Sequence, residues 1–587
     1  MFDKLSPSQL NIVSCSDKRI VVKACPGSGK TFSVSARFAR LLNDNDLNRH
    51  QGIAAISFTN TACEEIRNNL QKFGVNKIGY PHFIGTIDSF INNYIFLPYG
   101  HLLMKCPKRP DIVGAEYNPW FNYDSRQTIK NKDGIVVNRD PNYYFDKVSF
   151  DLDNKPFPIM PPTSYHFSWK KMINKDDTLN AKIKSIIEIK KQHFRNGVAN
   201  QSDANYIAYK ILTRYPKIAK NISQKFPILI IDEAQDTTAI QMAIVDVLDK
   251  AQVESILLVG DPHQAIFEWN TAEPSLFMAK YNSPEWTSLE LSENRRSSNN
   301  ICRVNNRFFD NNMTSVSEED KDYPAMPEII GHTTHSESIN EIKDAFITEC
   351  QRLGIDEENL AITYRGRKFG ETHFGLINES ISGKNEMPWT HGYYYVRDLV
   401  YGKHLIDQGI HKKGLSLIER GYHKMHEGQA YVSSELIKSK IQSLGFRNYR
   451  DILFQFIQKL PKTNCTLLRW IELSRVNGHN FPINRNQANI NISNIFHEES
   501  TANADIPKFL KTIHSVKGMT LDAILVFLVK QDRSNYVTLL RKDYDKLTPP
   551  NQEQMRIVYV ACTRPKKLLW IAVPTEDVDV WKNKLIK

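Results

Sequence analysis

The clearest chemistry in the sequence belongs to a glycine-rich stretch near the N-terminus. Its residues are Ala24, Cys25, Pro26, Gly27, Ser28, Gly29, Lys30 and Thr31. In such a loop, backbone N–H groups close around phosphates, the lysine reaches them and the threonine hydroxyl is a ligand for Mg²⁺. An ordinary turn before a helix is the alternative on this stretch alone. We expect a site for the β- and γ-phosphates of a nucleotide.

A pair of carboxylates offers complementary chemistry. Asp232 and Glu233 directly follow the apolar residues 228–231. We expect Asp232 to hold Mg²⁺ together with Thr31, and Glu233 to activate water as a general base. Acidic residues after a strand are also common helix N-caps, but the phosphate-binding stretch favours the catalytic interpretation.

Gln264 follows a further apolar run, residues 255–259, and is expected to respond to the γ-phosphate. Phe267 and Trp269 come directly after it, where their rings can stack on nucleobases. Two aromatic residues near a strand end are more often part of a core. Because they follow Gln264 in the sequence, we expect their stacking on bases to change with the state of the bound nucleotide.

These side chains need parallel strands to bring them together. The runs at residues 20–22, 52–57, 228–231 and 255–259 are typical of buried strands, each with polar residues at its C-terminal end. Two more polar loops fit this pattern, and can hold the phosphate or sugar of a nucleic-acid backbone. They are Phe58 with Thr59 and Asn60, and Gly85 with Thr86. Ordinary loops between strand and helix remain the alternative.

Two long segments interrupt the strand pattern. Residues 101–205 combine aromatic residues such as Trp120 and Trp169 with lysines, a composition that suits single-stranded nucleic acid or a solvated face over a small core. The lysines are Lys182, Lys184, Lys190 and Lys191. Residues 373–505 are mostly helical in pattern and contain no catalytic motif. We expect both segments to be insertions.

Composition limits the classes of protein. The chain has 587 residues, 41% of them hydrophobic, and a net charge of +11, which favours a polyanionic partner only weakly. Its 8 cysteines show no metal-ligand spacing, so we expect free thiols in a reducing compartment. No apolar run approaches membrane-spanning length and no signal peptide is evident, so we expect a cytoplasmic protein with no membrane contact.

In order, these segments resemble the UvrD/Rep/PcrA type of superfamily 1A DNA helicases. The segments that carry the resemblance are Gln9, residues 24–31, 58–60, 85–86, 232–236, 260–264, Asn294 with Arg296, residues 512–518 and residues 559–564. The resemblance implies an α/β fold with two RecA-like P-loop NTPase domains, each a parallel sheet flanked by helices with a mostly helical insertion. The first domain would comprise residues 1–100 and 206–291 around insertion 101–205, and the second residues 292–372 and 506–587 around insertion 373–505.

The resemblance also implies an ATP- and Mg²⁺-dependent translocase or helicase that acts on single-stranded DNA or a junction with duplex, generally moving 3′ to 5′. Expected catalytic residues are Lys30, Glu233, Gln264, Arg296 and Arg564, the arginines reaching the γ-phosphate across the cleft. Gln9 joins residues 24–31 in binding the nucleotide. The expected DNA contacts are Phe58, Thr59, Asn60, Gly85, Thr86, Phe267, Trp269, Thr512 and His514.

The chain departs from the family where the adenine is held. The family places an arginine after the phosphate-loop threonine and a tyrosine before the second-domain arginine, whereas this chain has Phe32 and Arg295. We expect the two faces of the adenine sandwich to be exchanged, because stacking on a purine needs one ring and one guanidinium on either side.

Short phrases such as residues 204–206 and 514–518 resemble UvrD-like proteins encoded beside OLD-type nucleases in bacterial defence systems such as Gabija. This resemblance implies a nuclease partner. The second insertion lacks a recognisable duplex-contacting signature, so unwinding is less secure than ATPase activity. The alternative to a motor is therefore a nucleotide- and DNA-sensing regulatory ATPase that controls a partner nuclease in anti-phage defence.

Overall fold

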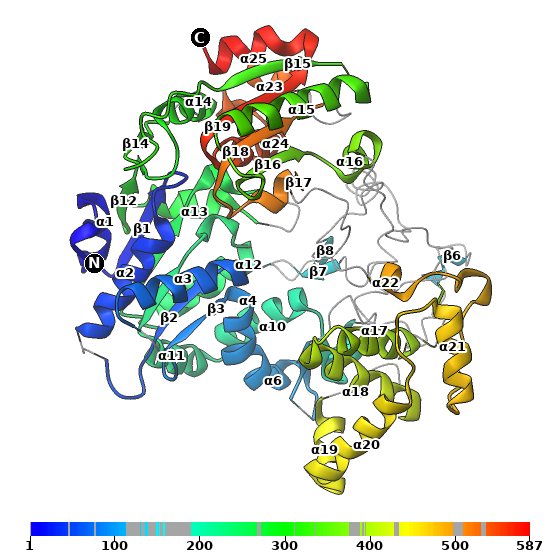
Figure 1. The fold of residues 1–587 in the computed structure, drawn as a ribbon. Coiled ribbons are helices and arrows are strands. Elements are labelled where there is room, and N and C mark those ends of the chain that lie inside the picture. Colours follow the sequence, from blue (N-terminus) through cyan, green and yellow to red (C-terminus); the bar gives the residue numbers. More distant parts are fainter. Residues whose placement is uncertain are drawn as a thin grey trace.

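The computed structural model carries two parallel sheets and a separate group of helices (Figure 1). The structure describes residues 2–44, 47–75, 78–107, 109–112, 129–130, 136–138, 148–150, 152, 156–158, 190–266, 272–309, 311–333, 335–374, 388–389, 393, 395–427, 434–496, 509–529 and 536–587. Phe267 and Trp269, and most of segment 101–205 with Trp120 and Trp169, lie outside the described residues.

The first sheet has six parallel strands in the order β12-β1-β11-β10-β2-β3. The strands are β1 (Arg19–Ala24), β2 (Ile53–Ser57), β3 (Phe83–Thr86), β10 (Ile228–Ile231), β11 (Ser255–Gly260) and β12 (Thr287–Leu291). Alternate residues enter different cores: Val21 packs on one face of the sheet, and Ile20 and Val22 pack on the other. Burial on both faces explains why the central strands β2 and β10 are almost continuously apolar, whereas the edge strand β12 is partly exposed.

Helices cover both faces of this sheet (Figure 1). They are α1 (Pro7–Ser14), α2 (Lys30–Asn43), α3 (Asn60–Lys72), α4 (Ile87–Ile91), α10 (Gln201–Arg214), α11 (Pro216–Lys225), α12 (Ala239–Lys250) and α13 (Pro274–Tyr281). Several begin directly at the carboxyl end of a strand with a capping side chain: Thr59 caps α3 and Thr86 caps α4. The carboxyl edge of the sheet is therefore lined by helix N-termini.

The second sheet has five parallel strands in the order β15-β19-β18-β16-β17. These are β15 (Glu328–His332), β16 (Leu360–Tyr364), β17 (Leu510–Thr512), β18 (Leu521–Phe527) and β19 (Pro565–Pro574). Around it lie α14 (Asn299–Phe309), α15 (Ser336–Arg352), α16 (Arg367–Phe374), α23 (Tyr536–Leu540), α24 (Pro549–Cys562) and α25 (Val578–Leu585). Two parallel sheets with flanking helices confirm the predicted α/β fold class.

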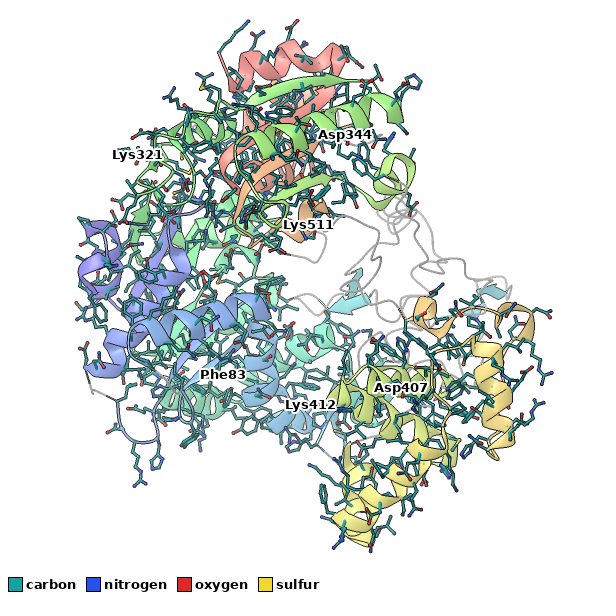
Figure 2. The ribbon with its side chains drawn as sticks, in the orientation of Figure 1. Phe83, Lys321, Asp344, Asp407, Lys412 and Lys511 are labelled. Carbon is teal, nitrogen blue, oxygen red and sulfur yellow. The ribbon has the colours of Figure 1, made fainter. Side chains whose placement is uncertain are left out.

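The helical group between β16 and β17 lies apart from the second sheet (Figure 2, where Asp407 and Lys511 are labelled). Its helices are α17 (Tyr395–Asp407), α18 (His411–Glu427), α19 (Ser434–Leu444), α20 (Phe446–Lys459), α21 (Leu467–Val476) and α22 (Ile492–Ile495). They bury a core of their own that includes Trp389 and Trp470. These aromatic residues thus pack inside the helical group.

The margins of segment 101–205 differ from expectation. Met104 and Ala199 pack in the core of the first sheet, and α10 begins at Gln201, so the expected boundary between residues 205 and 206 falls inside a helix. The expected boundary between residues 372 and 373 likewise falls inside α16. The suggestion that Lys190 follows nucleic-acid phosphates is wrong, because its side chain is fully buried and pairs with Asp203 at 2.7 Å.

Candidate active site between the two sheets

Backbone geometry makes the stretch between β1 and α2 a tight loop. Gly27 and Gly29 have φ angles of +70° and +77°, in the left-handed region that favours glycine. A Cβ atom on Gly27 would lie 2.8 Å from the Arg296 Cβ, and one on Gly29 would lie 2.8 Å from the Gln9 Nε2. Side chains at these two positions would collide with Arg296 and Gln9, so glycine is required there. The loop leads directly into α2, whose N-terminus favours an anion.

The α1 helix holds Gln9 against this loop. Ser6 caps α1, and Ser6 and Gln9 form a reciprocal capping box. The Gln9 side chain donates through Nε2 to the Ser28 carbonyl at 3.1 Å. Arg37 of α2 donates to the carbonyls of Ile12 and Cys15, both at 2.7 Å, so α1 is fixed to α2 at its other end.

The expected magnesium ligands lie in contact. The Thr31 hydroxyl donates to Asp232 Oδ2 at 2.8 Å. Burial and the neighbouring charge of Glu233 raise the pKa of Asp232, so a cation at this corner would favour the ionised carboxylate. The described residues contain no group of three or more His, Cys, Asp or Glu side chains that could hold a metal. A Mg²⁺ ion here would need further ligands from phosphates and water, which is its usual manner of binding.

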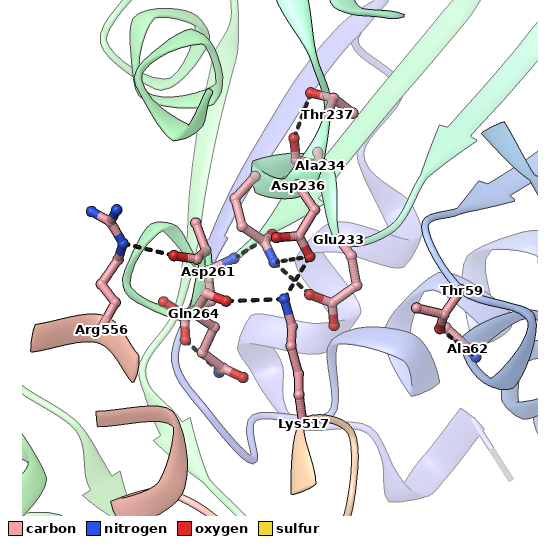
Figure 3. Close-up of polar contacts among 12 residues, drawn as sticks. Thr59, Ala62, Glu233, Ala234, Asp236, Thr237, Asp261, Gln264, Lys517 and Arg556 are labelled. Atoms are coloured by element: carbon pink, nitrogen blue, oxygen red, sulfur yellow. Dashed lines mark hydrogen bonds and ion pairs between the residues drawn. The ribbon is translucent and has the colours of Figure 1, made fainter. Parts of the chain in front are cut away.

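Glu233 occupies a strained position at the end of β10. Its φ of +54° is unusual for a residue with a side chain, and such strain is typical of functional sites. Burial would raise the pKa of Glu233, but the charges of Lys30 and Lys517 outweigh burial and lower it. The Gln235 amide donates to the Glu233 carboxylate and accepts from the Asp261 N–H at 3.0 Å (Figure 3). Glu233 is thus ionised and oriented, as a general base requires.

Three side chains from the second sheet reach this edge of the first sheet. Lys517 Nζ lies 2.6 Å from Asp236 Oδ2 and donates to the Gln264 carbonyl at 3.0 Å (Figure 3). Arg556 Nε donates to the Ala265 carbonyl at 2.7 Å. The third, Arg564, donates to the Gln264 side chain through Nη2. The site therefore lies between the sheets.

Two guanidiniums face this interface, Arg564 buried and Arg296 partly buried. Arg296 donates to the Thr563 carbonyl at 3.1 Å, and Arg564 donates to the Val560 carbonyl at 2.9 Å. Burial, and then the charge of Arg296, lower the pKa of Arg564. Arg564 is buried, and within the described ranges neither arginine forms an ion pair with a carboxylate. Close buried cations favour an anion between them.

Asn294 joins the phosphate loop to the first of these arginines. Its Nδ2 donates to the Pro26 carbonyl at 2.9 Å, and its Oδ1 accepts from the Arg296 N–H at 2.8 Å. Arg295 donates its own N–H to the Gly27 carbonyl at 2.9 Å, and its side chain pairs with Glu293 at 3.3 Å. Phe32, in the first turn of α2, packs against Phe73, with ring centroids 5.1 Å apart.

Three of the expected DNA-contacting residues, Thr59, Thr86 and Thr512, cap the helical turns that follow them. Thr59 Oγ1 accepts from the Ala62 N–H at 3.2 Å (Figure 3), and Thr86 Oγ1 accepts from the Ser89 N–H at 3.2 Å. Thr512 caps the turn that contains His514 in the same way. Phe58 and Gly85 are half-buried, whereas Thr59 and Asn60 are exposed.

Sequence reasoning did not assign roles to Lys517, Asn294 and Gln235, although all three make contacts at the centre of the site. All three stood within segments that carried the family resemblance, which is the signal that could have identified them. Their contacts with Pro26, Asp261 and Asp236 join segments that are distant in the sequence. No described helix has the length and hydropathy needed to cross a membrane.

Two family models match this chain. The UvrD/REP helicase N-terminal domain matches residues 5–285, and the UvrD-like helicase C-terminal domain matches residues 437–576. The chain belongs to the UvrD/Rep/PcrA-type helicases. The predictions of this family and of an ATP-dependent DNA helicase enzyme are confirmed.

Curated relatives of this UvrD-type helicase are distant. It is 22% identical to the ATP-dependent DNA helicase PcrA of Staphylococcus aureus, over 98% of this chain and 84% of that protein. A probable DNA helicase II homologue from Mycoplasma capricolum is 23% identical over 53% of this chain and 42% of that protein. One subunit of an ATP-dependent helicase/nuclease from Natranaerobius thermophilus is 35% identical, over 24% of this chain and 11% of that protein.

Proposed function

We propose that this helicase is an ATP-driven translocase on single-stranded DNA that moves 3′ to 5′ and hydrolyses ATP between its two parallel sheets. The observation that carries the proposal is the convergence at one interface of the Thr31–Asp232 pair, the ionised Glu233 and the arginines Arg296 and Arg564. These groups come from both sheets. Hydrolysis at this interface would therefore change the contact between the domains.

Each side chain has a role that its geometry supports. The phosphate loop and Lys30 bind the β- and γ-phosphates, while Thr31 and Asp232 would hold Mg²⁺, which neutralises phosphate charge when bound. Glu233 takes a proton from the attacking water. Arg296 and Arg564 stabilise the charge that develops on the γ-phosphate, as arginine fingers do.

The proposed first domain, residues 1–100 and 206–291, surrounds the first sheet and is extended to keep α10 whole. The proposed second domain, residues 292–372 and 506–587, surrounds the second sheet and is extended to keep α16 whole. In this scheme the loops containing residues 58–60, 85–86 and 512–514 hold the DNA backbone. These loops lie at the carboxyl ends of β2, β3 and β17, toward the interface between the sheets. Phe267 and Trp269 complete the proposed DNA contacts by stacking on bases.

The proposal is tested by steady-state ATPase rates with and without single-stranded DNA. We expect DNA to raise the rate of the intact protein many-fold, and Lys30→Ala to abolish turnover. Arg564→Lys should lower kcat by about 10³-fold or more with little change in KM, because the lysine lacks the planar fork that contacts two phosphate oxygens. Arg541→Lys, at an exposed position near the second sheet, is the control. A rate that is indifferent to DNA would reject the motor.

A regulatory ATPase that controls a nuclease is the second candidate. The relative whose name describes an ATP-dependent helicase/nuclease supports it, as does the phrase-level resemblance to defence proteins. In this case a partner nuclease would read the nucleotide state, and the protein would show little unwinding of its own. Strand displacement from a duplex with a 3′ tail or with a 5′ tail separates the two candidates and also reports polarity.

A further inference from the structure

A carboxylate outside the nucleotide site connects three helices. Asp88 lies at the start of α4, two residues after Thr86. Its Oδ1 accepts a hydrogen bond from Gln241 Nε2 at 3.0 Å and another from Asn205 Nδ2 at 3.0 Å. Burial raises the pKa of this carboxyl, and the two donors oppose the rise. Such a group is costly to bury unless its hydrogen bonds are made.

The Gln241 side chain connects Asp88 to the catalytic loop. Thr238 caps α12 directly after residues 232–237, and Gln241 is the third residue of that helix. Gln241 Oε1 accepts from the Thr238 N–H at 3.0 Å, while Thr238 Oγ1 accepts from the Gln241 N–H at 3.2 Å. One end of the amide therefore completes the cap, and the other end holds Asp88.

This second bond is not needed for either helix cap. Thr86 already caps α4, and the oxygen of Gln241 already completes the cap of α12. A glutamate would cap α12 equally well but would present a second carboxylate to Asp88. The amide nitrogen of Gln241 donates the hydrogen bond that joins α12 to α4. A glutamine at this position can therefore connect the loop before α12 with the loop before α4.

A third connection reaches the base of segment 101–205. Asn205, the second donor to Asp88, lies in α10 and accepts from Gln201 Nε2 at 3.1 Å. Gln201 and Asn92 exchange hydrogen bonds of 2.9 and 3.2 Å, which tie α10 to the helical segment that follows α4. The start of α4 is thus fixed to both α10 and α12.

We infer that Asp88 is a positioning residue that transmits occupancy of the DNA loop at Gly85 and Thr86 to the catalytic loop through Gln241. The inference rests on the proposed DNA-stimulated ATPase. DNA bound at residues 85–86 would fix the N-terminus of α4. The Asp88–Gln241 bond would then hold the N-terminus of α12, and with it the loop that carries Glu233, in the hydrolytic arrangement.

The decisive variant is Gln241→Glu, which keeps the cap of α12 but removes the donor to Asp88. The readout is the ratio of kcat with saturating single-stranded DNA to kcat without DNA, together with KM for ATP, Kd for single-stranded DNA and Tm. We expect the ratio to fall by about 2- to 30-fold, the range of measured coupling between sites, while the rate without DNA is retained. Gln71→Glu, an exposed substitution in α3 with the same charge change, should leave the ratio unchanged.

Rescue separates positioning from folding. In the double variant Asp88→Asn with Gln241→Glu, the new amide donates to the new carboxylate, so the link is restored with the roles reversed. We expect the ratio to recover. Gln241→Met, which removes both hydrogen-bonding atoms at similar volume, is the second variant if Gln241→Glu does not fold, and it should show the same loss.

An unchanged ratio in Gln241→Glu would overturn the inference, as would a loss that the double variant does not rescue. A fall in Tm with a constant ratio would show that the network is only structural. An intact protein whose rate does not respond to DNA would reject the proposed function itself, which distinguishes the two failures.

Discussion

At the scale of single residues, the nucleotide loop is flanked by an aromatic ring and a guanidinium. Phe32 lies in the first turn of α2, directly after the loop, and the Arg295 N–H donates to the Gly27 carbonyl within the loop. The Arg295 side chain pairs with Glu293 at 3.3 Å, and among the described residues its buried Nε has no hydrogen-bond partner. The face of the guanidinium could stack on a purine.

We therefore predict that Phe32→Ala and Arg295→Ala each raise KM for ATP by about 2- to 30-fold, the range of desolvated cation–π and stacking contacts, with kcat little changed. Steady-state ATPase assays at saturating DNA measure both constants. Arg352→Ala, which removes an exposed arginine of α15, should leave KM unchanged. An exchanged adenine sandwich is ruled out if neither loop variant alters KM.

At the scale of elements, the two sheets meet through an aromatic cluster as well as through ions. The His263 ring, which follows β11, stacks on Phe309 of α14 with ring centroids 4.3 Å apart. Tyr544 and Tyr559 contact the same ring edge-on, at 5.9 and 6.2 Å. Asn311 Nδ2 lies 3.4 Å from His263 Nδ1. These contacts come from elements around the second sheet.

Burial, and then the charges of Lys23 and Arg556, lower the pKa of His263 to about 3. Because the unfolded chain protonates this residue near its ordinary pKa of about 6.5, the stability that the neutral ring contributes is present above that pH and is lost as pH falls toward 3. Each pH unit in this window costs about 1.4 kcal/mol.

We predict that His263→Phe makes the protein less sensitive to acid, because the phenyl ring keeps the stack on Phe309 but does not titrate. Between pH 6.5 and 5 the intact protein should lose about 2 kcal/mol more than the variant, or about 4–8 °C in Tm. Thermal unfolding across this range measures the difference. Parallel pH profiles for the two proteins would contradict the assignment of this titration to His263.

At the scale of the whole molecule, a nucleotide between the sheets should join them more firmly. The direct ties include the Lys517–Asp236 ion pair and the bond from Arg556 to the Ala265 carbonyl. A ligand that binds only the folded state stabilises it by about 2.7 kcal/mol at a concentration 100 times its Kd.

We predict that a non-hydrolysable ATP analogue with Mg²⁺ raises Tm of the intact protein and raises the unfolding temperatures of both sheets together. Differential scanning calorimetry measures this directly. Lys30→Ala should abolish the shift, whereas the analogue should still stabilise Arg541→Lys. A shift confined to one of two separate transitions would mean that the nucleotide contacts only one domain.

The sequence alone determined the local parts of this protein. Short apolar runs form the buried centres of β1, β10 and β11. They could be recognised directly, because a strand centre that is buried on both faces is made of apolar residues. The phosphate loop could also be recognised from the sequence. Its glycines, Lys30 and Thr31 are consecutive or nearly consecutive residues, so the pattern is visible without knowing any distant partner.

Only the tertiary structure decided the contacts between distant segments. Lys517 meets Asp236 across a sequence separation of 281 residues, and Arg564 meets Gln264 across 300. The local sequence does not identify these partners, because the packing of the whole chain determines which side chain lies beside a buried cation. Gln241 is a further example. The local sequence predicts that its amide completes a helix cap, and its hydrogen bond to Asp88 forms only because α4 and α12 pack together.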